Sequence, residues 1–225
     1  MSELDASSAF SRLLQANWKE RFHDPGIRDW TDFWNLDGER ATVTNTDLGF
    51  EFRAGPTFGE DSDHGVLWTR ESFSGDLRVE YEYTRLDEET RGVNIIYLHA
   101  TGEGAPPYLE DVAEWSELRQ VPAMSLYFEH MHAYHVSYAA FPNTGDSRPG
   151  YIRARRYTAQ RLNGTELSPD YEPGALFATG VPHRMTLIVA HDDRDGDHIY
   201  LKIDDGSETK LCHWPNTEFR PLDHG

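Results

Sequence analysis

Short segments of alternating apolar and polar residues run along most of this chain. Residues 77–84, LRVEYEYT, give the cleanest alternation, which is typical of a strand with one buried face. Residues 93–99, VNIIYLH, are apolar on both faces, as expected for a central strand covered on both sides. Further strands bounded by Gly, Pro and polar residues are predicted at 41–46, 49–53, 66–69, 185–190 and 198–204. The last two form a predicted hairpin around residues 192–197.

Helical spacing is rare by comparison. Residues 7–20 predict a helix, since Phe10, Leu13, Leu14 and Trp18 recur at helical intervals. A second short helix or a long loop is predicted at 107–120, a packed loop at 22–36 and a turn-rich crossing at 163–174. No internal repeat is evident. We therefore expect one all-β domain over residues 1–225, a jelly-roll sandwich of two antiparallel sheets with one or two short helices, in which residues 1–30 form an N-terminal extension.

Two neighbouring segments concentrate the unusual side chains. Residues 127–141 and 151–157 are predicted to be adjacent strands, on which successive side chains face opposite ways. His135 then shares a face with Ser137 and Ala139, while Tyr134 and Tyr138 share the other face with Val136. In the second segment Arg153, Arg155 and Tyr157 lie on one face. Pairing of the two strands would bring imidazole and guanidinium groups onto one surface.

The charge pattern favours a small anionic ligand. The formal net charge is −18, with 39 acidic against 21 basic residues, and such a field repels nucleic acid and anionic membranes. Five of the basic residues nevertheless lie between Arg148 and Arg161. A local basic patch inside an acidic envelope suits a carboxylated ligand. Pairing of these arginines with the chain's own carboxylates is an equally weighted alternative. An oligosaccharide is the expected partner, and a homodimer is left open.

Location is indicated by what the sequence lacks. No apolar run approaches the roughly 18 residues of a membrane span. The N-terminus has neither the basic region nor the apolar region of a secretory signal. The single Cys212 cannot form an internal disulfide, and its position near the C-terminus indicates a structural thiol rather than a nucleophile. We expect a cytoplasmic protein.

Several segments resemble a known bacterial family. They are residues 68–83 (WTRESFSGDLRVEYEY), 93–102 (VNIIYLHATG), 134–141 (YHVSYAAF) and 151–157 (YIRARRY). These runs are similar to the family called domain of unknown function 1961, and the resemblance covers most of the chain from about Trp30. It implies a concanavalin A-like lectin/glucanase jelly roll associated with polysaccharide utilisation. More loosely, His, Tyr and Arg on one sheet are similar to alginate-type polysaccharide lyases, with Tyr97 where their Gln-x-His strand carries Gln and His99 as its histidine.

The leading hypothesis is β-elimination on a uronic-acid-containing oligosaccharide, by a lyase or dehydratase. Such a reaction needs a base for the proton α to the carboxylate, an acid for the leaving group and cations for the enolate-like charge. His135 or Tyr138 would act as base or acid, with Arg155 at the developing charge. The expected substrate-binding residues are Asn94, Tyr97, His99, Tyr134, Arg153 and Tyr157.

Other chemistries stay open. A non-catalytic carbohydrate-binding jelly roll is one alternative, and a glycoside hydrolase using Glu80 and Glu82, two residues apart on one face, is another. His130 and His132 have the i, i+2 spacing of a strand that holds Zn²⁺. The acidic loop around Gly196 could bind Ca²⁺ through Asp192, Asp193, Asp195 and Asp197, although polar surface residues are the more natural reading of both groups. No cofactor is expected.

Overall fold

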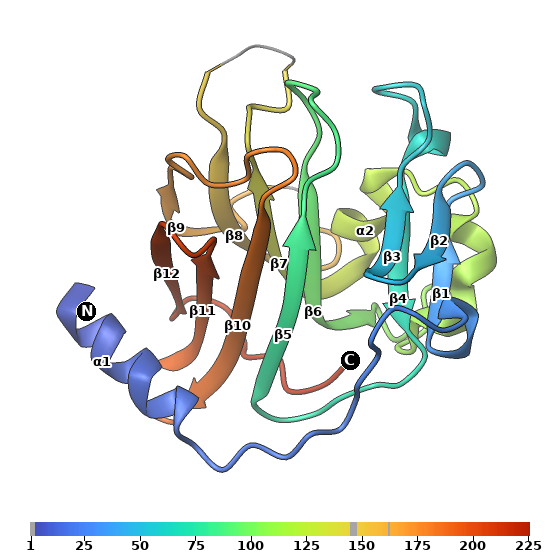
Figure 1. Ribbon diagram of the computed structural model, residues 1–225. Helices are drawn as coiled ribbons and strands as arrows, with labels where there is room; N and C mark the ends of the chain where they lie inside the picture. The colour runs from blue at the N-terminus through green and yellow to red at the C-terminus, as the bar shows by residue number, and fades with distance from the viewer. Residues whose placement is uncertain (1–2, 145–147, 162) are drawn as a thin grey trace.

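Two four-stranded antiparallel sheets face each other in the computed structural model, which describes residues 3–144, 148–161 and 163–225 (Figure 1). The first sheet has the order β12-β11-β10-β5 and the second the order β6-β7-β8-β9. The strands of the first are β5 (Leu77–Thr84), β10 (Pro182–Asp192), β11 (Gly196–Asp204) and β12 (Thr209–Asn216). Those of the second are β6 (Asn94–Gly102), β7 (Met131–Ala139), β8 (Tyr151–Tyr157) and β9 (Glu166–Tyr171). The predicted all-β sandwich is confirmed.

The main core fills the space between the two sheets. From the first sheet it takes Val79, Tyr81 and Tyr83, the apolar face that alternation predicts for β5. Trp214 and Cys212 of β12 lie in the same core. Burial raises the pKa of the Cys212 thiol to about 12. Its thiol is therefore protonated at neutral pH, in keeping with a structural residue.

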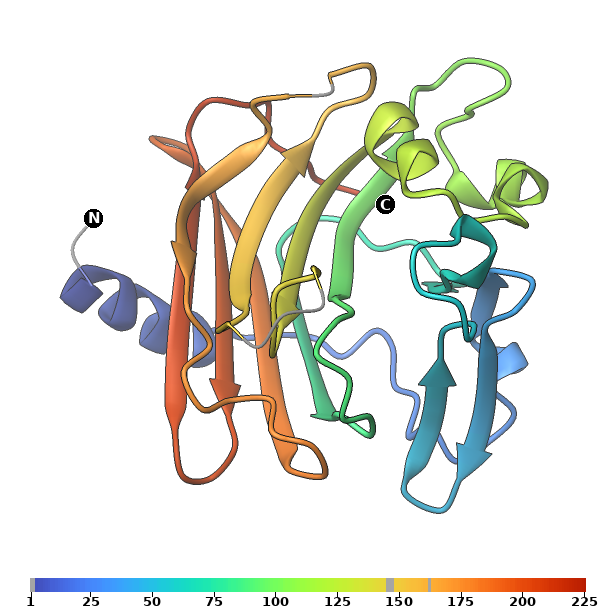
Figure 2. The ribbon, with the colours of Figure 1, turned by 90° about the horizontal axis from the view of Figure 1, so that it is seen from above.

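Helix α1 (Glu3–Leu14) covers part of the outer face of the first sheet, as the edge-on view shows (Figure 2). Its Phe10 ring lies 5.9 Å from the ring of Tyr200 on β11. The helix ends six residues before the predicted end at residue 20. The Trp18 indole N–H donates to the Leu13 carbonyl (2.7 Å), so Trp18 folds back onto the last turn instead of continuing it. No helix in these described ranges has the length and apolarity needed to cross a membrane.

Smaller elements cover the outer face of the second sheet. Two short sheets, β1–β4 and β2–β3, lie beyond it together with α2 and three 3₁₀ helices (Figures 1 and 2). Their bounds are β1 (Trp34–Asp37), β2 (Thr42–Thr46), β3 (Gly49–Arg53), β4 (Val66–Thr69), α2 (Met124–His130), η1 (Trp30–Asp32), η2 (Asp61–Asp63) and η3 (Val112–Arg119). The layers therefore follow the order α1, first sheet, second sheet, outer elements.

One buried carboxylate joins four of these outer elements. Asp37, at the end of β1, accepts hydrogen bonds from Arg119 of η3 (2.6 Å), Trp68 of β4 (2.7 Å) and Tyr127 of α2 (3.0 Å). The Trp68 and Tyr127 rings also stack on the Tyr97 ring of β6, with centroids 5.5 and 5.8 Å apart. This Asp37 cluster fixes the outer elements against the second sheet.

Two expectations about the second sheet are wrong. Residues 127–141 do not form one strand, because 124–130 are helical. Met124, Tyr127, Phe128 and Met131 have i, i+3, i+4, i+7 spacing and pack together in one cluster, so helical burial prevails there. Strand β9 also lies inside the segment predicted as a turn-rich crossing.

Candidate functional site

The antiparallel register of the second sheet lines up the predicted site residues in rows. Tyr97 of β6 lies opposite His135 of β7, and His135 lies opposite Arg155 of β8. In the next row Ser137 lies opposite Arg153. This register confirms the predicted pairing of the histidine and arginine strands. As a consequence, both residue types share the outer face of the sheet.

This outer face forms the floor of a large cleft. The floor residues are Tyr97, His135, Ser137, Arg153, Arg155 and Tyr157. Residues of the β2–β3 hairpin and of the segments that follow it also line the cleft. The hairpin lies beyond the outer face of the second sheet (Figure 2). At one end, α2, η3 and β4 pack over the sheet around Ala133 and Tyr157. The rest of the floor remains open beside the two arginines.

Four polar atoms of the floor are buried without a hydrogen-bond partner within the described part of the chain. They are the Tyr97 hydroxyl, His135 Nδ1 and the Nε atoms of Arg153 and Arg155. A buried polar group left unpaired costs about 1–3 kcal/mol, and more when it is charged. Four such atoms on one surface are therefore available to a polar ligand or to water.

Both arginines also meet acids of the neighbouring strand β9. Arg153 lies 3.3 Å from Asp170, and Arg155 Nε lies 3.9 Å from Glu166, too far for a hydrogen bond. The Arg153 guanidinium carbon sits 3.6 Å from the ring centroid of Tyr151. The side chains of Arg153 and Arg155 keep 29% and 32% of their surface exposed. The two arginines thus lie near acids of their own chain, as the alternative from the sequence expected. They also keep an exposed face toward the cleft.

His135 is neutral in this environment. It is 3% exposed, with its ring 4.9 Å from the ring of Tyr157 and 5.7 Å from that of Tyr97. Burial, followed by the positive charge of Arg155, lowers the pKa of His135 to about 3. Burial raises the pKa of Tyr157, which Arg155 partly opposes. At neutral pH the floor therefore presents a neutral imidazole, a protonated phenol and two guanidinium groups.

The low pKa of His135 predicts acid sensitivity. Unfolding restores a pKa near 6.5, so between about pH 3 and pH 6.5 the unfolded chain holds a proton that the folded protein does not. Stability is thus full above pH 6.5 and falls as the pH drops. From pH 7 to pH 5, His135 alone should remove about 2 kcal/mol of unfolding free energy. Urea unfolding at both pH values should show that His135→Gln loses less stability than the wild type, whereas equal losses would refute the neutral assignment.

Tyr134 and Tyr138 do not lie on the outer face with His135, contrary to the site predicted from the sequence. Both side chains point into the core between the sheets, where the Tyr81 hydroxyl donates to that of Tyr138 (3.3 Å). Burial raises the pKa of Tyr138 well above its usual range. Tyr138 is therefore excluded as acid or base at the outer face, and Tyr134 as a substrate contact there.

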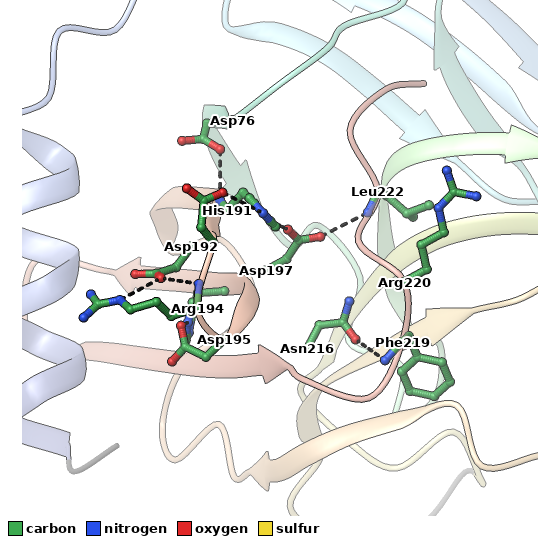
Figure 3. A network of polar contacts seen from close by, with 12 residues as sticks. Asp76, His191, Asp192, Arg194, Asp195, Asp197, Asn216, Phe219, Arg220 and Leu222 are labelled. Carbon is green, nitrogen blue, oxygen red and sulfur yellow. Dashed lines mark hydrogen bonds and ion pairs between the residues drawn. The ribbon is translucent and has the colours of Figure 1, made fainter.

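Tyr134 is instead part of a buried polar network centred on Asp197. The Tyr134 hydroxyl donates to the Asp197 carboxylate and accepts from the Asn216 amide (2.8 Å). Asp197 also meets His191 Nδ1 (2.7 Å) and the backbone N–H of Leu222 (3.1 Å), as Figure 3 shows. This network fixes the β10–β11 turn to the segment after β12.

Asn94 and His99 also lie elsewhere than the predicted substrate-binding surface. Asn94 lies opposite Tyr138 and donates to the Tyr83 hydroxyl (3.0 Å), so it belongs to the core side of β6. The register of β6 shifts between Leu98 and Thr101, and His99 adopts a left-handed φ of 51°. This bulge breaks the alternation that would place His99 beside Tyr97, and its ring lies 6.4 Å from the Tyr134 ring instead.

The predicted hydrolase carboxylates lie on the other side of the molecule. Glu80 accepts from Arg78 (3.0 Å), and Arg78 also donates to the Leu14 carbonyl at the end of α1 (3.2 Å). Glu80 and Glu82 alternate with the core residues Val79, Tyr81 and Tyr83 on β5, so both face away from the core and from the second sheet. They do not share a surface with His135.

Neither of the two candidate metal sites, which the sequence left open as alternatives, is assembled. His130 ends α2 while His132 belongs to β7, so the strand spacing does not apply; His130 meets Glu103 (2.6 Å) and His132 accepts from the Ala159 N–H (3.3 Å). In the acidic turn the Asp197 oxygens are engaged in the buried network and Asp192 accepts from the Arg194 N–H (2.9 Å). Among the described residues, no three His, Cys, Asp or Glu side chains form a group suited to a metal ion.

Some residues of the site were missed from the sequence. Tyr151 has the same parity as Arg153 on β8, so alternation along that strand was sufficient to include it. Glu166 and Asp170 belong to β9, where Pro169 and the polar composition resemble a turn. The acids that accompany the arginines therefore went unrecognised.

Comparison of the chain with protein-family models, with curated proteins and with solved structures finds no match. The chemistry of the cleft floor is thus the basis on which its function is inferred.

Proposed function

We propose that the cleft binds a saccharide that carries carboxylates and cleaves it by β-elimination, and that the domain belongs to the family called domain of unknown function 1961. The observation that supports it is the row of Tyr97, His135 and Arg155, in which each side chain keeps a polar atom without a protein partner in the described ranges. A carboxylated sugar offers acceptors for the guanidinium groups and a weakly acidic C–H for the imidazole.

Arg153 and Arg155 would bind the carboxylate. Guanidinium–carboxylate hydrogen bonds are among the strongest in proteins, and two neighbouring arginines define both the position and the plane of the group. The net charge of −18 opposes binding of anions to most of the surface. The floor is a local exception because it carries two neighbouring arginines. The carboxylate would therefore select this surface.

His135 would be the base. In the proposed step its neutral imidazole takes the proton from the carbon α to the carboxylate, that C–H electron pair forms a double bond to the next carbon, and the glycosidic C–O bond at that carbon breaks. Tyr157 gives its hydroxyl proton to the departing oxygen, and afterwards the His135 imidazolium releases its proton to solvent while the Tyr157 phenolate takes one up. Arg155 stabilises the enolate-like charge. A bound carboxylate offsets the guanidinium charges and so removes the smaller cause of the lowered pKa of His135, whereas burial, the larger cause, remains.

The test is incubation with di-, tetra- and hexasaccharides of galacturonate, mannuronate, guluronate and glucuronate while the absorbance of the conjugated double bond is recorded. Product should form with at least one sugar, and Arg153→Gln with Arg155→Gln should abolish both binding and product. Absence of product and of calorimetric binding across the panel would overturn the proposal.

Binding without turnover is a second candidate, favoured by one observation. His135 is 3% exposed, whereas the two arginines each keep about a third of their surface exposed. A ligand held only by the arginines would leave the imidazole beneath it unreacted. Calorimetric binding that depends on Arg153 and Arg155, with no new absorbance and no effect of His135→Gln, would assign this function instead.

A further inference from the structure

The wall opposite the floor carries an exposed aromatic ring. Phe58 lies in the loop between β3 and η2 and is 47% exposed, and it lines the same cleft as His135 and Arg155. An apolar ring with this exposure gains free energy when a ligand face covers it. Phe58 is therefore a candidate contact for a ligand that reaches across the cleft.

The loop that carries Phe58 is anchored. Asp63, whose side chain is 2% exposed, accepts from the Thr57 N–H (3.1 Å) and pairs with Arg40 (3.4 Å). The Asp63 carbonyl accepts from the Gly55 N–H (2.8 Å). These contacts fix the backbone on both sides of Pro56, so the position of Phe58 is set before any ligand arrives.

A cation from a different segment lies beside this ring. Arg91, in the loop between β5 and β6, has its guanidinium carbon 4.9 Å from the Phe58 ring centroid. Its own loop is anchored by Arg85, which binds the Glu89 carbonyl, and by the Gly92 N–H, which donates to Asn143 (3.1 Å). Arg91 pairs with Glu89 (3.2 Å) and keeps 41% of its side chain exposed. A guanidinium and an aromatic face thus stand together on the wall.

We propose that Phe58 and Arg91 form a second subsite for a carboxylated sugar, so that the ligand is an oligosaccharide with repeated carboxylates that spans floor and wall. This inference rests on the proposed function. A sugar ring covers Phe58 with its C–H face while its carboxylate pairs with Arg91, which repeats the combination of Arg153 and Tyr151 on the floor. Arg91 lies three residues before Asn94, which pairs with Tyr138, and Tyr138 pairs with Ile152, so the loop of Arg91 lies at the same end of the second sheet as the floor residues Tyr151 and Arg153.

The experiment is a calorimetric length series on the full chain, with di-, tri- and tetrasaccharides of galacturonate, mannuronate, guluronate and glucuronate as probes. The measured quantity is the ratio of tetrasaccharide to disaccharide affinity. In the wild type the ratio should be at least about tenfold, which corresponds to about 1.4 kcal/mol. Phe58→Ala and Arg91→Gln should each reduce this ratio toward one.

Two controls separate this subsite from the floor. Arg155→Gln should weaken binding of both lengths and preserve the ratio. Leu118→Ala removes an apolar side chain of similar exposure that lies outside the cleft lining, and it should leave the ratio at the wild-type value. Thermal melting confirms that each variant is folded, and the two wall variants alter different loops, so a folding defect in one does not remove the test.

The outcomes are distinct. A wild-type ratio near one, or a ratio that neither wall variant changes, overturns the second subsite while the floor site stands. Absence of wild-type binding to every probe overturns the floor site, and the second subsite with it.

Discussion

Replacement of Asp37 by alanine should lower the free energy of unfolding by about 3–5 kcal/mol, because it leaves a buried guanidinium without its counter-ion. The Asp37 and Arg119 side chains are 2% and 1% exposed. The same change removes the acceptor of the Trp68 indole and of the Tyr127 hydroxyl. Chemical unfolding followed by tryptophan fluorescence measures the loss.

A matched surface pair provides the control. Glu51 pairs with Arg53 at 2.8 Å, with 36% and 66% of the respective side chains exposed. Glu51→Ala should change stability by no more than about 1 kcal/mol. The double variant Asp37→Ala with Arg119→Met should recover much of the loss, because it removes the unpaired charge. A loss below about 1 kcal/mol in Asp37→Ala would contradict the role of the cluster.

His135→Ala should reduce the turnover of a cleaved uronate by about 10²–10⁴-fold, the usual contribution of a positioned base. The affinity for that substrate should change far less, because Arg153 and Arg155 remain to hold the carboxylate. Steady-state kinetics on the unsaturated product, together with calorimetry on the same variant, separates the two quantities.

Tyr138→Phe is the control that distinguishes the two faces of β7. It removes a hydroxyl that accepts a hydrogen bond from Tyr81 in the core and does not reach the outer face, so turnover should stay near the wild-type value. A large loss in Tyr138→Phe with an active His135→Ala would reverse the assignment of the catalytic face.

Alternation was sufficient to predict much of the fold. The bounds of β5 and β8 agree with the predicted segments at 77–84 and 151–157, since each has one apolar face against the core. Strand β9 was missed because its single buried residue, Leu167, gives no alternation signal beside Pro169. For α2 the helical spacing was present, but it was hidden inside a longer strand-like run.

The site could be predicted only as far as the alternation of side chains along a strand, here called parity, determines which residues share a face. Parity correctly placed His135 with Arg153, Arg155 and Tyr157 once β7 and β8 were paired. It could not reveal the bulge after Leu98, which turns His99 away from Tyr97. It also could not show which face of β7 meets the other sheet, because that depends on contacts between residues distant in the sequence. The wall with Phe58 and Arg91 is a tertiary feature of the same kind.

The acids beside the two floor arginines have a consequence for selectivity. Asp170 and Glu166 belong to the same chain, so they are always present at a high effective concentration next to Arg153 and Arg155. An incoming carboxylate must exchange with a tethered competitor, and it gains only the difference between the two contacts. Small acids such as acetate make no further contact that would favour this exchange. The floor should therefore bind common small anions weakly and bind more tightly those ligands that also cover its aromatic rings.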